Sequence, residues 1–172
     1  MKKFLFILLS TYLALIFLMP KEQLFYTLKA VLQERKITIS QEGLKDRLID
    51  LKIEDAKLFY DGIESARIKS ISVKPWLIYN SAVAKDISSG KDVKRVFDLK
   101  DGFVRISQAL WYPFVVKIEA EGNFGKVWGS LKLKEGKIKL ICEPSKNFKR
   151  SQIFRELFRK RDEGYVYESL IK

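Results

Sequence analysis

Few side chains in this sequence could support catalysis. Its 172 residues include no histidine, which is the commonest general base and transition-metal ligand in proteins. Mechanisms that pair histidine with serine or cysteine are therefore excluded. Cys142 is the only thiol, so neither an internal disulfide nor a thiolate zinc cluster can form. We expect Cys142 to act as a small apolar residue inside a strand.

Two further patterns resemble functional motifs but fail on spacing. The carboxylates Asp46, Asp50, Asp55 and Asp61 lack the D-x-D-x-D-G order of a calcium loop, and they alternate with lysines, which is typical of a solvated strand edge. The Gly-Asn-Phe-Gly segment at 122–125 precedes neither a helix nor a Lys-Ser or Lys-Thr pair, so it predicts a turn rather than a phosphate loop. We expect no enzyme activity, no metal and no cofactor.

The chain is strongly basic, with a formal net charge of +12 and a pI near 9.7. Such a charge attracts lipid headgroups, nucleic acids or acidic protein surfaces, and its sign alone does not choose among them. Nucleic acid is not the expected partner, because no helix-turn-helix, zinc knuckle or ribonucleoprotein aromatic motif is present.

The first twenty residues predict a membrane anchor. Lys2 and Lys3 precede an apolar run over residues 4–19, whose length fits either a signal peptide or an anchor. Residues 17–21, Phe-Leu-Met-Pro-Lys, lack the small residues that a signal peptidase requires, which favours an uncleaved anchor. The expected anchor residues are Phe4, Leu5, Phe6, Ile7, Leu8, Leu9, Leu13, Leu15, Ile16, Phe17 and Leu18.

Basic residues occur on both sides of this run, so charge counting does not decide the orientation. A Lys-Lys pair at the extreme N-terminus normally stays in the cytoplasm, and long domains are translocated largely regardless of charge. We expect a single-pass protein of the inner membrane, with an anchor at 1–20, a periplasmic β-domain at 21–144 and a basic tail at 145–172.

The exported part begins with a helix and continues with strands. Apolar residues recur every three or four positions between Lys21 and Arg35, which predicts an amphipathic helix. Alternation then indicates strands near Ile37–Ile39 and Ile49–Tyr60, with a change of phase near Glu54 and Asp55 that a β-bulge would accommodate.

Turn residues divide the following segment into hairpins. Asp61-Gly62 predicts a two-residue hairpin turn that returns the chain through Ile68, Ile71 and Val73. Pro75 predicts that the chain leaves the sheet or follows an edge. We expect a short strand at 81–87 and a flexible loop at 88–94.

The clearest alternation forms a three-stranded meander that ends at Pro144, with lysines on its outer face. Those lysines suit a binding surface, but they also suit protection against edge-to-edge pairing. The apolar side chains could line an open groove or a closed core, and they are Val116, Ile118, Val127, Leu131, Leu133, Ile138 and Leu140.

After Pro144 the pattern predicts a basic amphipathic helix, with Gly164 as its C-terminal cap and a short strand at 165–167. Such a helix could lie on anionic headgroups, bind a partner, or cap the sheet. The candidate interface residues are Arg150, Phe154, Arg155, Phe158, Arg159 and Arg161.

Three segments together resemble the N component of type II secretion systems and, more distantly, AsmA-like envelope proteins. They are the Pro-x-x-x-Leu opening at 20–24, the strand pair at 48–73 followed by Pro75-Trp76-Leu77, and the glycine-punctuated repeat at 121–136. The resemblance implies a mainly β fold, here an antiparallel, open jellyroll-like sheet. Members of the family are usually longer, and the tail after Ser145 is not part of the pattern.

The leading functional hypothesis is a non-catalytic subunit of an envelope machine, of the secretion, pilus or DNA-uptake kind, whose partners are other inner-membrane subunits. The C component of lipopolysaccharide transport has the same order of parts. The alternative is therefore a periplasmic lipid-transfer protein whose wide apolar face forms a groove.

Overall fold

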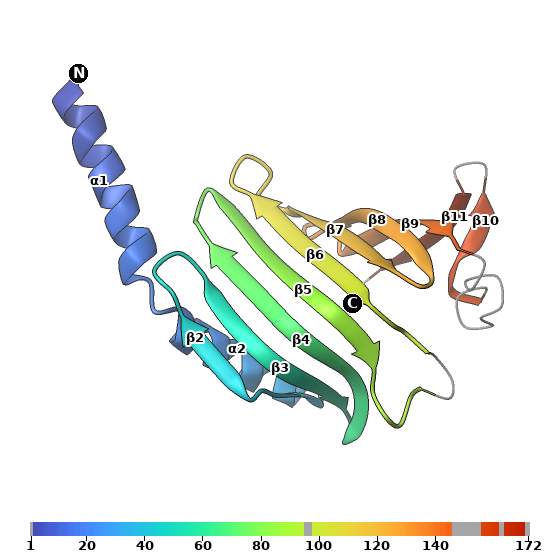
Figure 1. Cartoon of the computed structure of the whole chain (residues 1–172). Helices are drawn as coiled ribbons and strands as arrows, with labels where there is room; N and C mark the ends of the chain where they lie inside the picture. Colours follow the sequence, from blue (N-terminus) through green and yellow to red (C-terminus); the bar gives the residue numbers. More distant parts are fainter. Residues whose placement is uncertain (1, 95–97, 146–155, 162–163, 171–172) are drawn as a thin grey trace.

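The computed structural model describes residues 2–94, 98–145, 156–161 and 164–170. Two helices come first, α1 (Lys2–Leu18) and α2 (Lys21–Glu34), and α2 confirms the amphipathic helix expected from residue 21. Figure 1 shows α1 extending away from one end of a broad sheet while α2 lies against that sheet. No described helix alone has the length and hydropathy of a membrane span. Taken together, α1 and α2 have that length and hydropathy, but they are bent by 55° at the break between them.

The rest of the described chain forms one antiparallel sheet (Figure 1), which confirms the mainly β prediction. The strand order is β1-β3-β4-β5-β6-β7-β8-β9-β11-β10, and β2 pairs with β3 beside β1. The strands are β1 (Ile37–Ser40), β2 (Gly43–Asp46), β3 (Leu51–Tyr60), β4 (Ile63–Pro75), β5 (Tyr79–Ser89), β6 (Gly102–Ala109), β7 (Val115–Gly122), β8 (Gly125–Lys132), β9 (Lys137–Pro144), β10 (Arg159–Arg161) and β11 (Gly164–Leu170).

The expected hairpins are present. Asp61 and Gly62 have φ angles of 51° and 82° and join the paired residues Tyr60 and Ile63, as a tight primed turn requires. The meander of β7, β8 and β9 is also confirmed, with its first turn between Gly122 and Gly125.

Strand β4 ends at Pro75, so the chain leaves the sheet there, which is one of the two expected outcomes. The other is wrong, because β4 lies between β3 and β5 and not at an edge of the sheet. The pairing of β4 with β3 ends at Val73, so the missing N–H of Pro75 interrupts no bond to β3.

The change of phase near Asp55 is real, but the pairing of β3 with β4 has no bulge there; a register shift lies farther along the sheet, between β5 and β6 at Ala84–Ile87. Asp55 in β3 and Asp86 in β5 both adopt positive φ, 50° and 53°, which aspartate tolerates better than most residues. The alternation shifts together in β3, β4 and β5, so apolar residues stay opposite one another in two rows, Ile53–Ile71–Ala84 and Ala56–Ile68–Ile87. The apolar face is therefore continuous across the shift.

Other expectations need correction. Strand β6 has no counterpart in the sequence analysis, and β5 reaches Ser89, so the expected loop begins later than residue 88. The strands form one sheet in nearly sequential order, which gives no support to a jellyroll, a fold of two packed sheets.

The basic helix expected up to residue 161 is wrong at its described end. Arg159–Arg161 form β10, and Gly164 begins β11 instead of capping a helix. The strand expected at 165–167 is confirmed as part of β11, which pairs with β9 and extends the sheet. Pairing of β10 with β11, and of β11 with β9, satisfies the backbone groups of this segment.

Two hydrophobic clusters of described residues stabilise the sheet, one at its β3 side and the other at its β8–β11 side. In the first, Phe25 of α2 packs on Leu51, Ile53 and Ala56 of β3. In the second, Phe158 packs on Val127 and Cys142, and its ring centroid lies 5.9 Å from that of Tyr167. Both clusters use the same face of the sheet, because the register places their strands in common rows.

Candidate functional site: one apolar face

The candidate site is the apolar face of the sheet, which runs from β3 to β11. Side chains opposite one another in adjacent antiparallel strands point to the same side, so the register defines this face. Three of its rows are Ile53–Ile71–Ala84–Val104–Ala120–Val127–Cys142–Tyr165, then Leu51–Val73–Ala82–Ile106–Ile118–Gly129–Leu140–Tyr167, and finally Val116–Leu131–Ile138.

Six of the seven side chains proposed from the sequence for a groove or core lie on this face. The exception is Leu133, which follows β8, is 50% exposed, and donates its backbone N–H to the carbonyl of Phe114 at 2.8 Å. The alternation of β8 continues to Leu133 in sequence, but β8 ends at Lys132, so Leu133 belongs to a loop.

The middle strands of the face are less covered by other side chains than the strands at its two sides, where the clusters lie. Ile53 and Cys142, which belong to the two clusters, are 2% and 1% exposed, whereas Ile106 of β6 is 42% exposed. A shallow cavity of about 240 Å³ lies beside Ile106 and includes Val73, Ala82 and Val116 in its lining. An apolar surface that is buried at both sides and open at its centre resembles a groove for an apolar ligand more than a closed hydrophobic core.

Between β3 and β6 the opposite face is mostly polar and basic. Lys52, Lys85 and Arg105 line a cavity of about 520 Å³ together with the hydroxyls of Ser70 and Ser72. From β3 to β6 the two faces of the sheet therefore present contrasting chemistry, apolar on one side and mostly cationic on the other. At β8, β9 and β11 the opposite face carries an apolar row of its own, Trp128–Ile141–Val166.

On the same polar face, Lys52 and Lys45 donate hydrogen bonds of 2.7 and 2.9 Å to the Glu54 carboxylate. These bonds stabilise the carboxylate anion and lower the pKa of Glu54 to about 2. The side chain is thus a fixed negative charge among lysines, a role that does not require it to exchange protons.

The thiol and two of the carboxylates that could be reactive are buried or engaged in hydrogen bonds and ion pairs that stabilise the fold. Cys142 is buried, and loss of solvation together with the nearby Glu143 carboxylate raises the pKa of its thiol to about 11. Asp50 accepts a hydrogen bond from the Ser72 hydroxyl at 3.0 Å, and Asp46 forms an ion pair with buried Lys21 at 3.0 Å. Within the described residues, no cluster of histidine, cysteine or carboxylate side chains is arranged to hold a metal ion.

The anchor and tail residues are placed only in part. All eleven anchor residues lie in α1, and ten of them are exposed, whereas Ile16 is buried. Arg150, Phe154 and Arg155 of the candidate interface lie outside the described residues. Phe158 is buried in the second cluster, while Arg159 and Arg161 are exposed on β10. Their proposed role as an interface stays a prediction.

Sequence reasoning missed two parts of the site. Strand β6 contributes Val104 and Ile106 to the centre of the face, and their alternation with Arg105 and Ser107 was the available signal. It also missed the exposed apolar loops at one end of the sheet. Comparisons with family models, with curated proteins and with solved structures find no match to this chain.

Proposed function

We propose that this chain is a membrane-anchored, non-catalytic protein of the bacterial envelope, and that its apolar sheet face holds the acyl chains of a lipid. The observation that carries the proposal is the continuous apolar face, which is packed at both ends and exposed at Ile106 in the middle. Acyl chains are flexible and undirected, so a smooth apolar surface without specific polar groups suits them.

The apolar helix α1 supports this assignment, because it would hold the sheet at a source of lipid. Residues at the centre of the face are small or branched aliphatics, such as Ala82, Ala84 and Val104, which leave space above the sheet. We place the sheet in the periplasm, because the Lys2-Lys3 pair on the other side of the apolar run favours a cytoplasmic location for that side.

A second proposal is a scaffold subunit of a secretion-type machine, in which a partner subunit covers the same face. Strand β10 favours it: among the described strands β10 pairs only with β11, and its Arg159 and Lys160 are exposed. A basic edge strand of this kind can accept an additional strand from an acidic partner.

Photo-crosslinking in intact cells separates these proposals. A photoreactive amino acid at Ile106 reports on the apolar face, and the same residue at neighbouring Arg105 is the control, because consecutive residues of β6 point to opposite faces. Lipid carriage predicts lipid adducts at position 106 and few at position 105. Protein adducts at 106 without lipid would favour the scaffold proposal. Equal, weak labelling at both positions would contradict both.

A further inference from the structure

One end of the sheet carries exposed apolar loops. The loops 47–50, 76–78, 110–114 and 133–136 meet at this end, because consecutive antiparallel strands place every second connection there. We call their apolar residues the apolar rim, which consists of Leu48, Ile49, Trp76, Leu77, Ile78, Leu110, Trp111, Tyr112, Phe114 and Leu133.

The rim is unusually exposed for such large side chains. Leu48, Leu110, Trp111 and Tyr112 are 72%, 61%, 64% and 63% exposed. Single exposed apolar residues are ordinary, but a contiguous group of this size marks an interaction surface. The opposite end includes the polar Asp61-Gly62 turn, which is flanked by exposed Tyr60 and Ile63.

Hydrogen bonds join the rim loops to one another. The Trp76 indole donates to the Ile49 carbonyl, and the backbone N–H of Leu110 donates to the Ile78 carbonyl, each at 2.8 Å. The Leu133–Phe114 bond described above extends this series to the β8–β9 loop. The four loops therefore form one connected surface.

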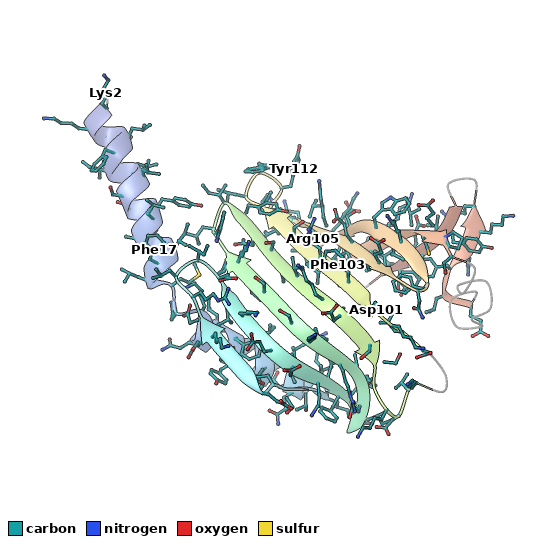
Figure 2. All side chains as sticks on the ribbon, viewed as in Figure 1. Lys2, Phe17, Asp101, Phe103, Arg105 and Tyr112 are labelled. Atoms are coloured by element: carbon teal, nitrogen blue, oxygen red, sulfur yellow. The ribbon has the colours of Figure 1, made fainter. Side chains whose placement is uncertain are left out.

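The rim lies beside the apolar helix α1. The Tyr12 hydroxyl donates a hydrogen bond of 2.8 Å to the carbonyl of Trp76, so the helix contacts the β4–β5 loop well before its last residue. Tyr12 precedes Leu18 by six residues, or about 9 Å along the helix axis at 1.5 Å per residue. Figure 2 shows Tyr112 at the end of the sheet that faces α1, and Asp101 at the other end of β6.

The composition of the rim matches the chemistry of a bilayer surface. Tryptophan and tyrosine favour the headgroup region, since their rings are apolar and their N–H or O–H groups remain hydrated. Two lysines lie over rim rings, Lys134 at 4.1 Å from the centre of Phe114 and Lys74 at 5.8 Å from that of Trp76. Their ammonium groups could pair with lipid phosphates at the same depth.

We infer that the apolar rim inserts into the headgroup region of the bilayer that receives α1, so that the sheet stands on the membrane by this end. Amphipathic elements penetrate about 5–10 Å into that region. With Leu18 at the membrane surface, the Tyr12–Trp76 contact lies about 9 Å below it along α1, so the rim reaches a similar depth. In this orientation the strands rise from the membrane and one end of the apolar face opens directly onto it. The inference rests on the membrane placement of α1 in the proposed function, and not on lipid carriage.

The three tryptophans of the chain provide a reporter and a matched control. Trp111 lies in the rim, whereas Trp128 lies in β8 on the face opposite the apolar face, and it is also exposed, at 44%. Two variants of the full chain each keep one of them: Trp76→Phe with Trp128→Phe keeps Trp111, and Trp76→Phe with Trp111→Phe keeps Trp128. Both are reconstituted into phosphatidylethanolamine–phosphatidylglycerol vesicles that contain brominated lipids, which quench tryptophan fluorescence on contact.

The inference predicts that brominated lipids quench Trp111 at least about twice as strongly as Trp128, because only the rim reaches their depth. Adding Leu110→Asp to the Trp111 variant should reduce its quenching to the level of Trp128 without changing the circular dichroism spectrum. Resistance to alkaline extraction reports separately on insertion of α1. If α1 resists extraction while Trp111 is quenched no more than Trp128, the rim inference is wrong and the anchor stands. If α1 is extracted, the membrane placement itself fails.

Discussion

At the scale of single residues, burial separates side chains that stabilise the fold from those available for function. Ile53 is 2% exposed in the first cluster, while Ile106 lies on the same face and is 42% exposed. The same chemical type therefore has two different roles, which substitutions can distinguish.

Replacing Ile53 with alanine should lower the free energy of unfolding by about 2–5 kcal/mol, because it leaves a cavity under Phe25. Replacing Ile106 with alanine should cost less than about 1 kcal/mol, yet reduce recovery of lipid with the protein. Urea titration followed by circular dichroism measures the first effect, and mass spectrometry of bound lipid measures the second. Full lipid recovery in a folded Ile106→Ala variant would contradict a role in the groove.

Cys142 should resist thiol reagents in the folded protein at pH 8 and react after denaturation. Burial raises the pKa of its thiol to about 11, so the reactive thiolate is scarce at that pH. The folded protein holds the thiol proton more tightly than the unfolded chain does, so protonated Cys142 contributes to the free energy of unfolding. This contribution is complete below about pH 9 and is lost as the pH rises towards 11. A Glu119→Cys variant with Cys142→Ala supplies an exposed control thiol, and equal labelling rates would show that Cys142 is accessible.

At the scale of elements, tight turns determine which strands become neighbours. Gly62 has φ of 82°, a conformation that costs other residues about 1–2 kcal/mol. Gly62→Val should therefore lower stability by about that amount, and Gly62→Asn by less, since asparagine tolerates positive φ. Urea unfolding midpoints test the difference. Equal stability of the valine and asparagine variants would mean that the turn relaxes into another form.

At the scale of the whole molecule, the described part of the sheet has two separate hydrophobic clusters instead of a single core. Phe25 belongs to one and Phe158 to the other, and each strand pairs mainly with its sequence neighbours. Stability in such an arrangement is a sum of neighbouring contacts, so the two ends should open independently.

Phe158→Ala should accelerate hydrogen exchange in β9 and β11 while leaving β3 and β4 protected. Phe25→Ala should do the reverse, which makes the two variants controls for each other. Hydrogen exchange with mass spectrometry resolves these segments. Uniform acceleration across the sheet in either variant would instead indicate one cooperative unit.

The sequence by itself determined the local structure of this protein. Alternation of apolar and polar residues, with Asp61-Gly62 and the glycines at 122–125, predicted strands and hairpins because both depend on residues that are close along the chain. The same reasoning missed β6, and it predicted a helix where Arg159–Arg161 form a strand, because pairing with β11 outweighs the helical periodicity of that segment.

Only the tertiary structure decided which surfaces exist. The apolar face depends on register between strands, and a shift of one residue would turn every side chain of a strand to the other side. The apolar rim depends on contacts between loops about thirty residues apart, such as Leu110 with Ile78, and on the bond from Tyr12 to Trp76. Such contacts leave no local pattern in the sequence, because they form only when long-range pairing has brought the loops to one end of the sheet.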